Sequence, residues 1–365
     1  MSELSDLLSR LVAIDSVNPE LVPGGAGESE LAGFVAGWCE HAGLEVEVEE
    51  VAPGRPNVVA VARGSGGGRS LMLNAHMDTV GVAGMERPHE PYVADGRLYG
   101  RGAYDMKGSL AAIMLAGAEA RRRRLRGDVI VAAVCDEELA SIGTAAVAGR
   151  LRVDAAIVSE PTELRLALAH KGFVAFEIEV AGRAAHGSRP DLGIDAIARM
   201  GHVLVRLEAL DRRLRADPSH PLLGSGSLHA SIVSGGQEYS SYPDHCLLQG
   251  ERRTIPGESV AQIEGELREL LGEIEGEVRV GVAREPFETS ESAEIASLVR
   301  RHAGGPEIVG VPFWADSALL SAAGIPTVVF GPAGEGAHAV VEWVDLATVE
   351  RCMEIYVAVA EELCA

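Results

Sequence analysis

SLMLNAHMD, at residues 70–78, is the stretch of sequence that decides the fold. Its first six residues are mainly apolar, as in a strand covered on both faces of a sheet, and polar side chains follow at once. Similar apolar runs occur at 128–135, 154–159 and 325–330, and an apolar helical stretch lies at 107–120. Strands that alternate with helices predict an α/β fold, with three layers and a mostly parallel central sheet.

The middle of the chain follows a different pattern, which predicts a second domain inserted into the first. An alternating strand at 173–180 is followed by a long helix, two strands, a helix and a last strand near 278–282. That order, β-α-β-β-α-β, is typical of a split ferredoxin-like unit. We therefore expect one domain from residues 1–171 and 285–365, interrupted by a small α/β domain at 172–284.

The net charge of the chain is strongly negative and argues against two classes of partner. It is −22 at pH 7, in a chain of 365 residues of which 47% are hydrophobic. Nucleic acids and anionic membranes bind clustered Lys and Arg, so neither is an expected partner. The one basic run, at residues 121–126, follows an apolar stretch and is interpreted as the solvated end of a helix.

Cysteine use and hydropathy predict a cytoplasmic protein without a membrane anchor. The five cysteines are scattered and include no Cys-x-x-Cys pair, which argues against a disulfide framework and a thiolate metal site. The first 18 residues lack a basic segment followed by an apolar run, so no signal peptide is expected. No apolar stretch approaches the roughly 18 residues of a membrane span.

Histidine and carboxylate side chains follow the predicted strands at the point where each strand ends. They are His76, Asp78, Glu137, Glu138, Glu160 and, in a glycine-rich loop, His338. Ligands of open α/β sheets bind outside the carboxyl ends of the strands, so we expect these groups to converge there. Converging buried charges are costly unless they are paired or bind a metal. Two imidazoles and several carboxylates without a thiolate suit zinc, cobalt or manganese.

The spacing within this cluster allows different roles for neighbouring residues. His76 and Asp78 are two residues apart, so both side chains lie on one side of an extended segment. One of them can bind a metal ion while the other orients it. Glu137 and Glu138 are adjacent and, if extended, point in opposite directions. One of these glutamates can then bind metal while the other acts as a general base toward a water.

Six short motifs, in their order along the chain, resemble those of a known family. They are His76-Met77-Asp78, Gly100-Arg101-Gly102 through Asp105-Met106-Lys107-Gly108, Asp136-Glu137-Glu138, Ser159-Glu160-Pro161-Thr162, Ala185-His186-Gly187-Ser188-Arg189-Pro190 and Gly336-Ala337-His338. Together they resemble the dinuclear-zinc family that contains acetylornithine deacetylase, succinyl-diaminopimelate desuccinylase, aminoacylase and a glutamate-releasing carboxypeptidase. The motifs span most of the chain, and the inserted domain lies where the family carries its lid.

The resemblance implies a centre of two divalent metal ions, zinc first, with cobalt or manganese as alternatives. It implies that Asp105 bridges the ions, that His76 and Glu160 complete one site, and that Glu138 and His338 complete the other. Without the resemblance, Asp105 lies just before an apolar helix, where an Asp is more often a helix cap.

The resemblance also implies which residues act on the substrate. Asp78 would orient His76. Glu137 would be the general base for attack by a bridging hydroxide and would pass the proton to the leaving amine. His186, in the inserted domain, would reach the substrate oxyanion, often from the neighbouring subunit of a dimer; a solvated turn histidine is the alternative. Arg253 would bind a substrate carboxylate through its planar fork, with Arg252 as the competing candidate.

One loop of the inserted domain departs from the family pattern. Many relatives carry Asn before a Pro-Asp pair, here Pro243-Asp244, and Ser241 occupies that place. Glu238 in the same loop either favours a cationic substrate side chain or is a solvated loop residue.

We therefore expect an enzyme: a metal-dependent amidohydrolase that cleaves the amide bond of a small N-acyl amino acid. A Glu at position 160 resembles the deacetylase and desuccinylase branches, whereas some aminopeptidase-like members carry Asp. The alternative is a dipeptidase or carboxypeptidase-type exopeptidase with the same metal centre, and a third hypothesis is a relative that binds ligands without catalysis. We expect a homodimer formed through the inserted lid domain.

Overall fold

Four parallel strands form the centre of the first of two units in the computed structural model, which describes residues 2–365. Their order in the sheet is β6 (Val129–Val134), β3 (Leu71–His76), β7 (Ala155–Val158) and β17 (Thr327–Val329). Every residue of these strands is buried, which explains why their sequences are apolar rather than alternating. Antiparallel strands extend the sheet on both sides: β2 (Arg55–Ala62) and β1 (Glu45–Ala52) beyond β6, and β8 (Leu166–His170) beyond β17.

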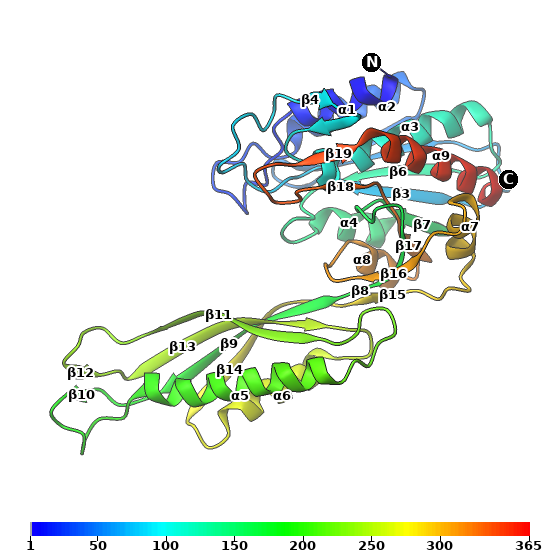
Figure 1. The fold of residues 1–365 in the computed structure, drawn as a ribbon. Helices are drawn as coiled ribbons and strands as arrows, with labels where there is room; N and C mark the ends of the chain where they lie inside the picture. The colour runs from blue at the N-terminus through cyan, green and yellow to red at the C-terminus, as the bar shows by residue number, and fades with distance from the viewer. Residues whose placement is uncertain (1) are drawn as a thin grey trace. The chain divides into compact units, whose positions relative to one another are not determined.

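Helices cover both faces of this sheet, so the predicted α/β fold with a mostly parallel central sheet is confirmed (Figure 1). One layer contains α1 (Glu3–Ala13), α2 (Ser29–His41), α3 (Gly108–Arg123) and α9 (Leu346–Leu363), and the other contains α4 (Ile142–Arg150) and α8 (Ser317–Ala322). The apolar helix α3 is buried along most of its length because it packs between the sheet and helices α1 and α9. The basic run was interpreted as the end of a helix, and Arg121, Arg122 and Arg123 do lie in the last turn of α3. Helix α7 (Glu294–His302) packs against α9.

A small second sheet in the same unit was not expected from the sequence. Its order is β18 (Gly334–Glu335), β19 (Trp343–Asp345), β5 (Arg97–Tyr99) and β4 (Tyr92–Ala94), all antiparallel. A single turn of π-helix, η1 (Ala103–Lys107), joins β5 to α3. This sheet brings the chain before Asp105 beside the chain on either side of His338.

The second unit comprises Ala169–Glu288 and Gly310–Trp314, so it begins and ends a few residues outside the predicted 172–284. Its sheet has the order β11 (Ser227–Gly235), β13 (His245–Thr254), β9 (Gly172–Ala181) and β14 (Gly276–Arg284), with antiparallel neighbours throughout. Helices α5 (Ala196–Ala216) and α6 (Val260–Leu271) connect these strands in the β-α-β-β-α-β order of a split ferredoxin-like unit.

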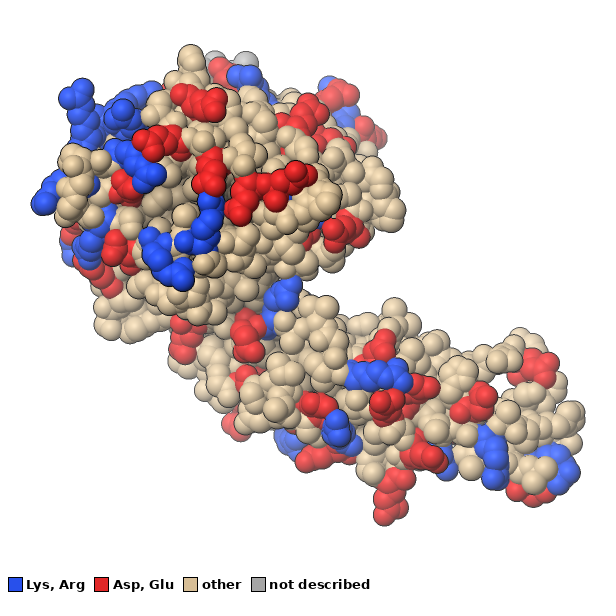
Figure 2. Space-filling view, turned by 180° about the vertical axis from the view of Figure 1, so that it is seen from behind, with Lys and Arg blue, Asp and Glu red and all other residues tan. Residues whose placement is uncertain are grey.

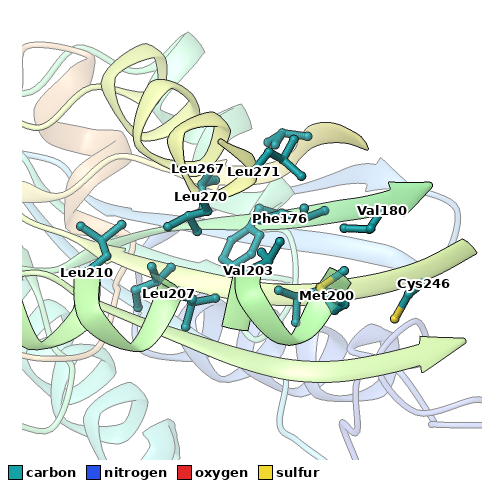
Figure 3. Packing of buried hydrophobic residues seen from close by; sticks show 14 of the residues in the cluster. Phe176, Val180, Met200, Val203, Leu207, Leu210, Cys246, Leu267, Leu270 and Leu271 are labelled. Atoms are coloured by element: carbon teal, nitrogen blue, oxygen red, sulfur yellow. The ribbon is translucent and has the colours of Figure 1, made fainter. Parts of the chain in front are cut away.

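The core of the second unit lies between its sheet and its two helices (Figure 3). Strand β9 alternates between buried and half-buried residues, so that Phe176 and its neighbours two residues away face the helices. Leu207 of α5 and Leu267 of α6 pack in the same cluster. The chain enters this unit along β8 and leaves it along β15 (Phe287–Glu288), whose residue Phe287 pairs with His170 at the end of β8.

Charged side chains on the face seen in Figure 2 are mixed, with Lys and Arg lying among Asp and Glu in both units. Exposed ion pairs of the first unit include those of Arg63 with Glu45 and Asp128, and of Arg123 with Glu119. Within residues 2–365, none of the helices combines the length and the hydropathy needed to cross a membrane.

Candidate metal centre

The polar side chains expected to converge do so at the carboxyl edge of the parallel strands. His76 is the last residue of β3, and Glu160 lies two residues beyond the end of β7. Glu137 and Glu138 lie in the turn after β6 rather than in an extended segment, so the opposite directions expected for an extended pair do not apply. Asp105 lies in η1, and His338, with a positive φ of 61°, lies in the loop between β18 and β19.

Asp105 lies at the centre of the cluster, with one carboxylate oxygen facing each histidine. Its Oδ1 is 3.1 Å from His76 Nε2, and its Oδ2 is 3.3 Å from His338 Nε2. Lys107, not Asp105, occupies the cap position of α3, and that helix has no side-chain cap hydrogen bond. The helix-cap alternative for Asp105 is therefore wrong.

Two groups of three side chains meet the geometric requirement for holding a metal ion. One is His76, Asp105 and Glu160, the other is Asp105, Glu138 and His338, and in each group the ligand atoms lie within 4.8 Å of one another. Glu138 Oε2 is 3.1 Å from His338 Nε2, while its buried Oε1 has no hydrogen-bond partner among the described residues. A buried carboxylate oxygen without a partner is costly, so this donor set fits a pair of divalent cations.

The charges of the cluster perturb one another strongly. Burial raises the pKa of Glu160 and of Glu137 well above the usual range, and each of these carboxylates is further disfavoured by acidic neighbours. Hydrogen bonds to Asp105 and Glu138 raise the pKa of His338 to about 10. So many buried acids at one place are the arrangement expected where a cation binds.

The ring of His76 has its proton placed for metal binding. Its Nδ1 lies 2.9 Å from the backbone carbonyl of Asp78, which can only accept a hydrogen bond. Nδ1 therefore carries a hydrogen, which leaves Nε2, the ring nitrogen that faces Asp105, as the atom that would bind a metal ion. The Asp78 carboxylate is 3.6 Å from Nδ1, so the expected orienting contact runs through the Asp78 main chain.

The carboxylate of Asp78 instead holds the turn that carries the two glutamates. Its Oδ1 accepts the Glu137 N–H at 3.0 Å and its Oδ2 accepts the Glu138 N–H at 3.2 Å. Asn18 also donates its side-chain amide to Asp78 Oδ2, at 2.8 Å, and to Asp136 at 2.9 Å. Asn18 was not found by sequence reasoning, because no spacing or motif links it to residues 60 and 118 positions away.

A buried ion-pair network lies behind this turn. Arg55 donates to Glu28 through two nitrogens at 2.7 Å and to Asp136 at 2.8 Å, and all three side chains are almost wholly buried.

Asp316 is a further buried acid. Burial raises its pKa to about 6, and its Oδ2 accepts the Thr144 hydroxyl at 2.6 Å.

In the second unit, His186 forms contacts that fix its tautomer. The backbone N–H of Ser188 donates to His186 Nδ1 at 3.2 Å, and the Ser188 hydroxyl lies 2.8 Å from the same atom. A neutral ring that accepts at Nδ1 carries its hydrogen on Nε2. The side chain is exposed, so this N–H can donate to a ligand.

The two arginine candidates differ in their surroundings. Arg252 is fully buried, and its guanidinium bonds Glu258 at 2.5 Å and the carbonyl of Arg253. Arg253 has a side chain that is 33% exposed, bonded to Glu251 at 2.6 Å, and is the arginine with nitrogen atoms available to a ligand. Ser241, the first residue of the short strand β12 (Ser241–Tyr242), donates its hydroxyl at 2.7 Å to Glu238 in the preceding loop.

Comparison with known proteins adds to this geometry. The family model described as Peptidase family M20/M25/M40 matches residues 72–362. An acetylornithine deacetylase from Myxococcus xanthus is 32% identical over 394 residues, covering 98% of this chain and 96% of that protein. Aminopeptidase PepT from Bacillus cereus has a similar fold, with a TM-score of 0.82 at 18% identity over 99% of this chain and 98% of that one. A Bacillus subtilis structure described as a dinuclear metal-binding peptidase gives a TM-score of 0.77 at 18% identity, over 99% and 97%.

Proposed function

The chain belongs to peptidase family M20/M25/M40 and is a metal-dependent hydrolase of amide or peptide bonds, and from that premise we propose that it releases the acyl group of a small N-acyl amino acid. The family resemblance expected from the six motifs is thereby confirmed. Similarity to an acetylornithine deacetylase along nearly the whole chain supports an N-acyl amino acid as the substrate class.

One observation carries the proposal: Asp105 turns its two carboxylate oxygens toward two different histidines. A carboxylate in that position can bridge two ions, with His76 and Glu160 on one side and Glu138 and His338 on the other. We propose zinc for both positions, with cobalt or manganese as substitutes, because the donors are imidazole and carboxylate. When bound, such a pair of ions supplies a water of lowered pKa and polarises the amide carbonyl.

Glu137 is the group proposed to move the proton. Its carboxylate is nearly buried and its Oε2 lies 4.0 Å from His76 Nε2, so it faces the centre while the Asp78 carboxylate anchors its backbone. Its pKa, raised by burial, suits a base that takes a proton from the attacking water and returns it to the leaving amine. The amide C–N bond breaks as the nitrogen receives that proton, which yields a carboxylic acid and a free amine.

Two side chains of the second unit are proposed to bind the substrate. His186 would donate its Nε2 hydrogen to the carbonyl oxygen as negative charge develops there. Arg253 would pair with the carboxylate of the amino acid, whereas Arg252 is committed to Glu258.

We further propose a homodimer formed through the second unit, in a reducing cytoplasmic environment. Edge strand β11 exposes the apolar side chains of Ile232 and Val233, 58% and 55% exposed, as an unpaired edge available to another chain. The five cysteines are buried and unpaired. Sedimentation showing only monomer at micromolar concentration would contradict the dimer.

A hydrolysis screen tests the function. N-acetyl, N-succinyl and N-formyl amino acids are compared with dipeptides, using protein loaded with zinc and with cobalt. We expect turnover of at least one N-acyl amino acid, and Glu137→Gln should keep its metal content while losing at least about 100-fold in rate. Turnover of dipeptides alone would replace the proposal with a dipeptidase. Unchanged turnover in Glu137→Gln would remove the assigned base.

A further inference from the structure

Glu342, which lies outside the six motifs, is a buried carboxylate. It accepts hydrogen bonds from the backbone of the loop that carries Asp105. Its side chain is fully buried. One oxygen, Oε1, accepts the N–H groups of Tyr104 at 2.9 Å and Asp105 at 3.0 Å. The other, Oε2, accepts the N–H of Gly102 at 2.9 Å and a nitrogen of Arg101 at 2.7 Å.

The same contacts join the Asp105 loop to the His338 loop. Glu342 lies four residues after His338, and its own carbonyl accepts the N–H of Gly100 at 3.2 Å. Arg101, itself buried, donates to Glu342 and also to the carbonyl of Ala339 at 3.0 Å. Two segments that meet at the centre are thus fixed to each other by one carboxylate and one guanidinium.

The backbone of this loop requires such support because it departs from regular structure at several positions. Asp105 and Met106 have non-helical φ and ψ within η1. Gly102 has a positive φ of 76°, and a Cβ there would lie 2.7 Å from a methyl of Thr79. Regular helix geometry therefore does not hold Asp105 in place, and three backbone N–H groups of the loop bond to Glu342 instead.

We propose that Glu342 is a positioning residue for the metal centre: it sets Asp105 between the two ions and locks the Asp105 loop to the His338 loop. The inference rests on the proposed function, because it takes Asp105 as the bridging ligand. Glu342 acts through the backbone of Asp105 and through Arg101, and it touches no ligand atom of the centre in the contacts described. Partners of this kind typically change metal affinity by about 10–100-fold when they are lost.

Glu342→Gln is the sharpest variant, because it preserves shape and removes one acceptor. A glutamine offers a single oxygen, which can serve only one of the two pairs of donors. The amide nitrogen then faces either the N–H groups of Tyr104 and Asp105 or those of Gly102 and Arg101. In both cases two buried donors lose their acceptor, and the loop relaxes away from the carboxylate.

The test is a titration of metal-free protein with cobalt chloride, followed by calorimetry and by the visible absorption of the bound ion. We expect wild-type protein to bind two ions, and Glu342→Gln to bind both about 10–100-fold more weakly with an altered absorption band. Glu258→Gln is the matched control, since Glu258 also pairs with a buried arginine and accepts a backbone N–H, from Ile255 at 2.9 Å, in the second unit. It should lower thermal stability and leave cobalt binding unchanged.

The outcomes distinguish a positioning role of Glu342, a general loss of stability, and failure of the proposed metal centre. Wild-type cobalt affinity in folded Glu342→Gln overturns the inference and leaves the proposed function standing. Equal weakening in Glu342→Gln and Glu258→Gln shows a general loss of stability and also overturns it. Failure of wild-type protein to bind a pair of ions removes the proposed function itself. If Glu342→Gln does not fold, Arg101→Lys, which keeps the charge and loses the planar fork, must show weaker cobalt binding for the inference to hold.

Discussion

Replacing Asp78 by Asn removes one acceptor oxygen from the side chain that fixes the turn of Glu137 and Glu138. Oδ1 of Asp78 accepts one hydrogen bond, from the Glu137 N–H, while Oδ2 accepts two, from Glu138 and Asn18. An asparagine at this position retains more bonds if its oxygen takes the Oδ2 place. Its amide nitrogen then faces the Glu137 N–H, which is left without an acceptor.

The cost of Asp78→Asn follows from this geometry. Asp78 is fully buried, and a buried donor left without an acceptor costs about 1–3 kcal/mol. We therefore expect the free energy of unfolding to fall by about that amount. The Glu137 backbone also loses its anchor, so its carboxylate no longer holds its place, and kcat should fall by about 10–100-fold, as for other supporting contacts around metal sites.

The assay combines urea unfolding with steady-state kinetics on the best substrate of the screen. Asp154→Asn is the matched control, because Asp154 also accepts a backbone N–H, from Ser70 at 2.7 Å, but at the opposite ends of the strands. That variant should keep wild-type kcat. An Asp78→Asn protein with wild-type kcat would refute the reasoning, whatever its stability.

Three further predictions follow from the same structure. Chelation should abolish hydrolysis and lower the melting temperature, with zinc or cobalt restoring both; activity that survives complete removal of metal would rule out the metal centre. Arg253→Ala should raise KM for substrates with a free carboxylate and change stability little. Arg252→Ala should destabilise the second unit by about 1–3 kcal/mol, as urea unfolding can measure, because Glu258 and the Arg253 carbonyl lose their charged donor. Burial raises the pKa of Asp316 to about 6, so the folded protein binds a proton at this site that the unfolded chain has already released. The folded state is therefore favoured at acid pH and loses this stability as pH rises through about 6. In chelated protein, wild type should therefore lose stability relative to Asp316→Asn between about pH 4 and pH 7, and a difference of the opposite sign would contradict this.

The sequence was sufficient to predict the central strands and the convergence of polar groups at their ends. Each buried strand is a short apolar run, and a parallel sheet places the residues that follow each run at one edge. Residues 76, 138 and 160 lie at the end of such a run or within four residues after it. Asp105 and His338 lie in irregular loops, and their inclusion depended on the resemblance to a family rather than on periodicity.

The supporting contacts could not be predicted in the same way. Glu342, Asn18 and Arg55 act through hydrogen bonds to segments far away in the chain, and no local pattern records such a pairing. Alternation could have separated Arg252 from Arg253, because every second residue of β13 is buried and Arg252 is on the buried side.

The strands by which the chain enters and leaves the second unit are neighbours, since Phe287 of β15 pairs with His170 of β8. An insertion whose two ends lie side by side can be exchanged or reshaped without moving the ends of the host sheet. All five candidate metal ligands belong to the host. The second unit, with the proposed substrate-binding residues His186 and Arg253, can therefore vary in sequence while the metal ligands and Glu137 of the host stay the same.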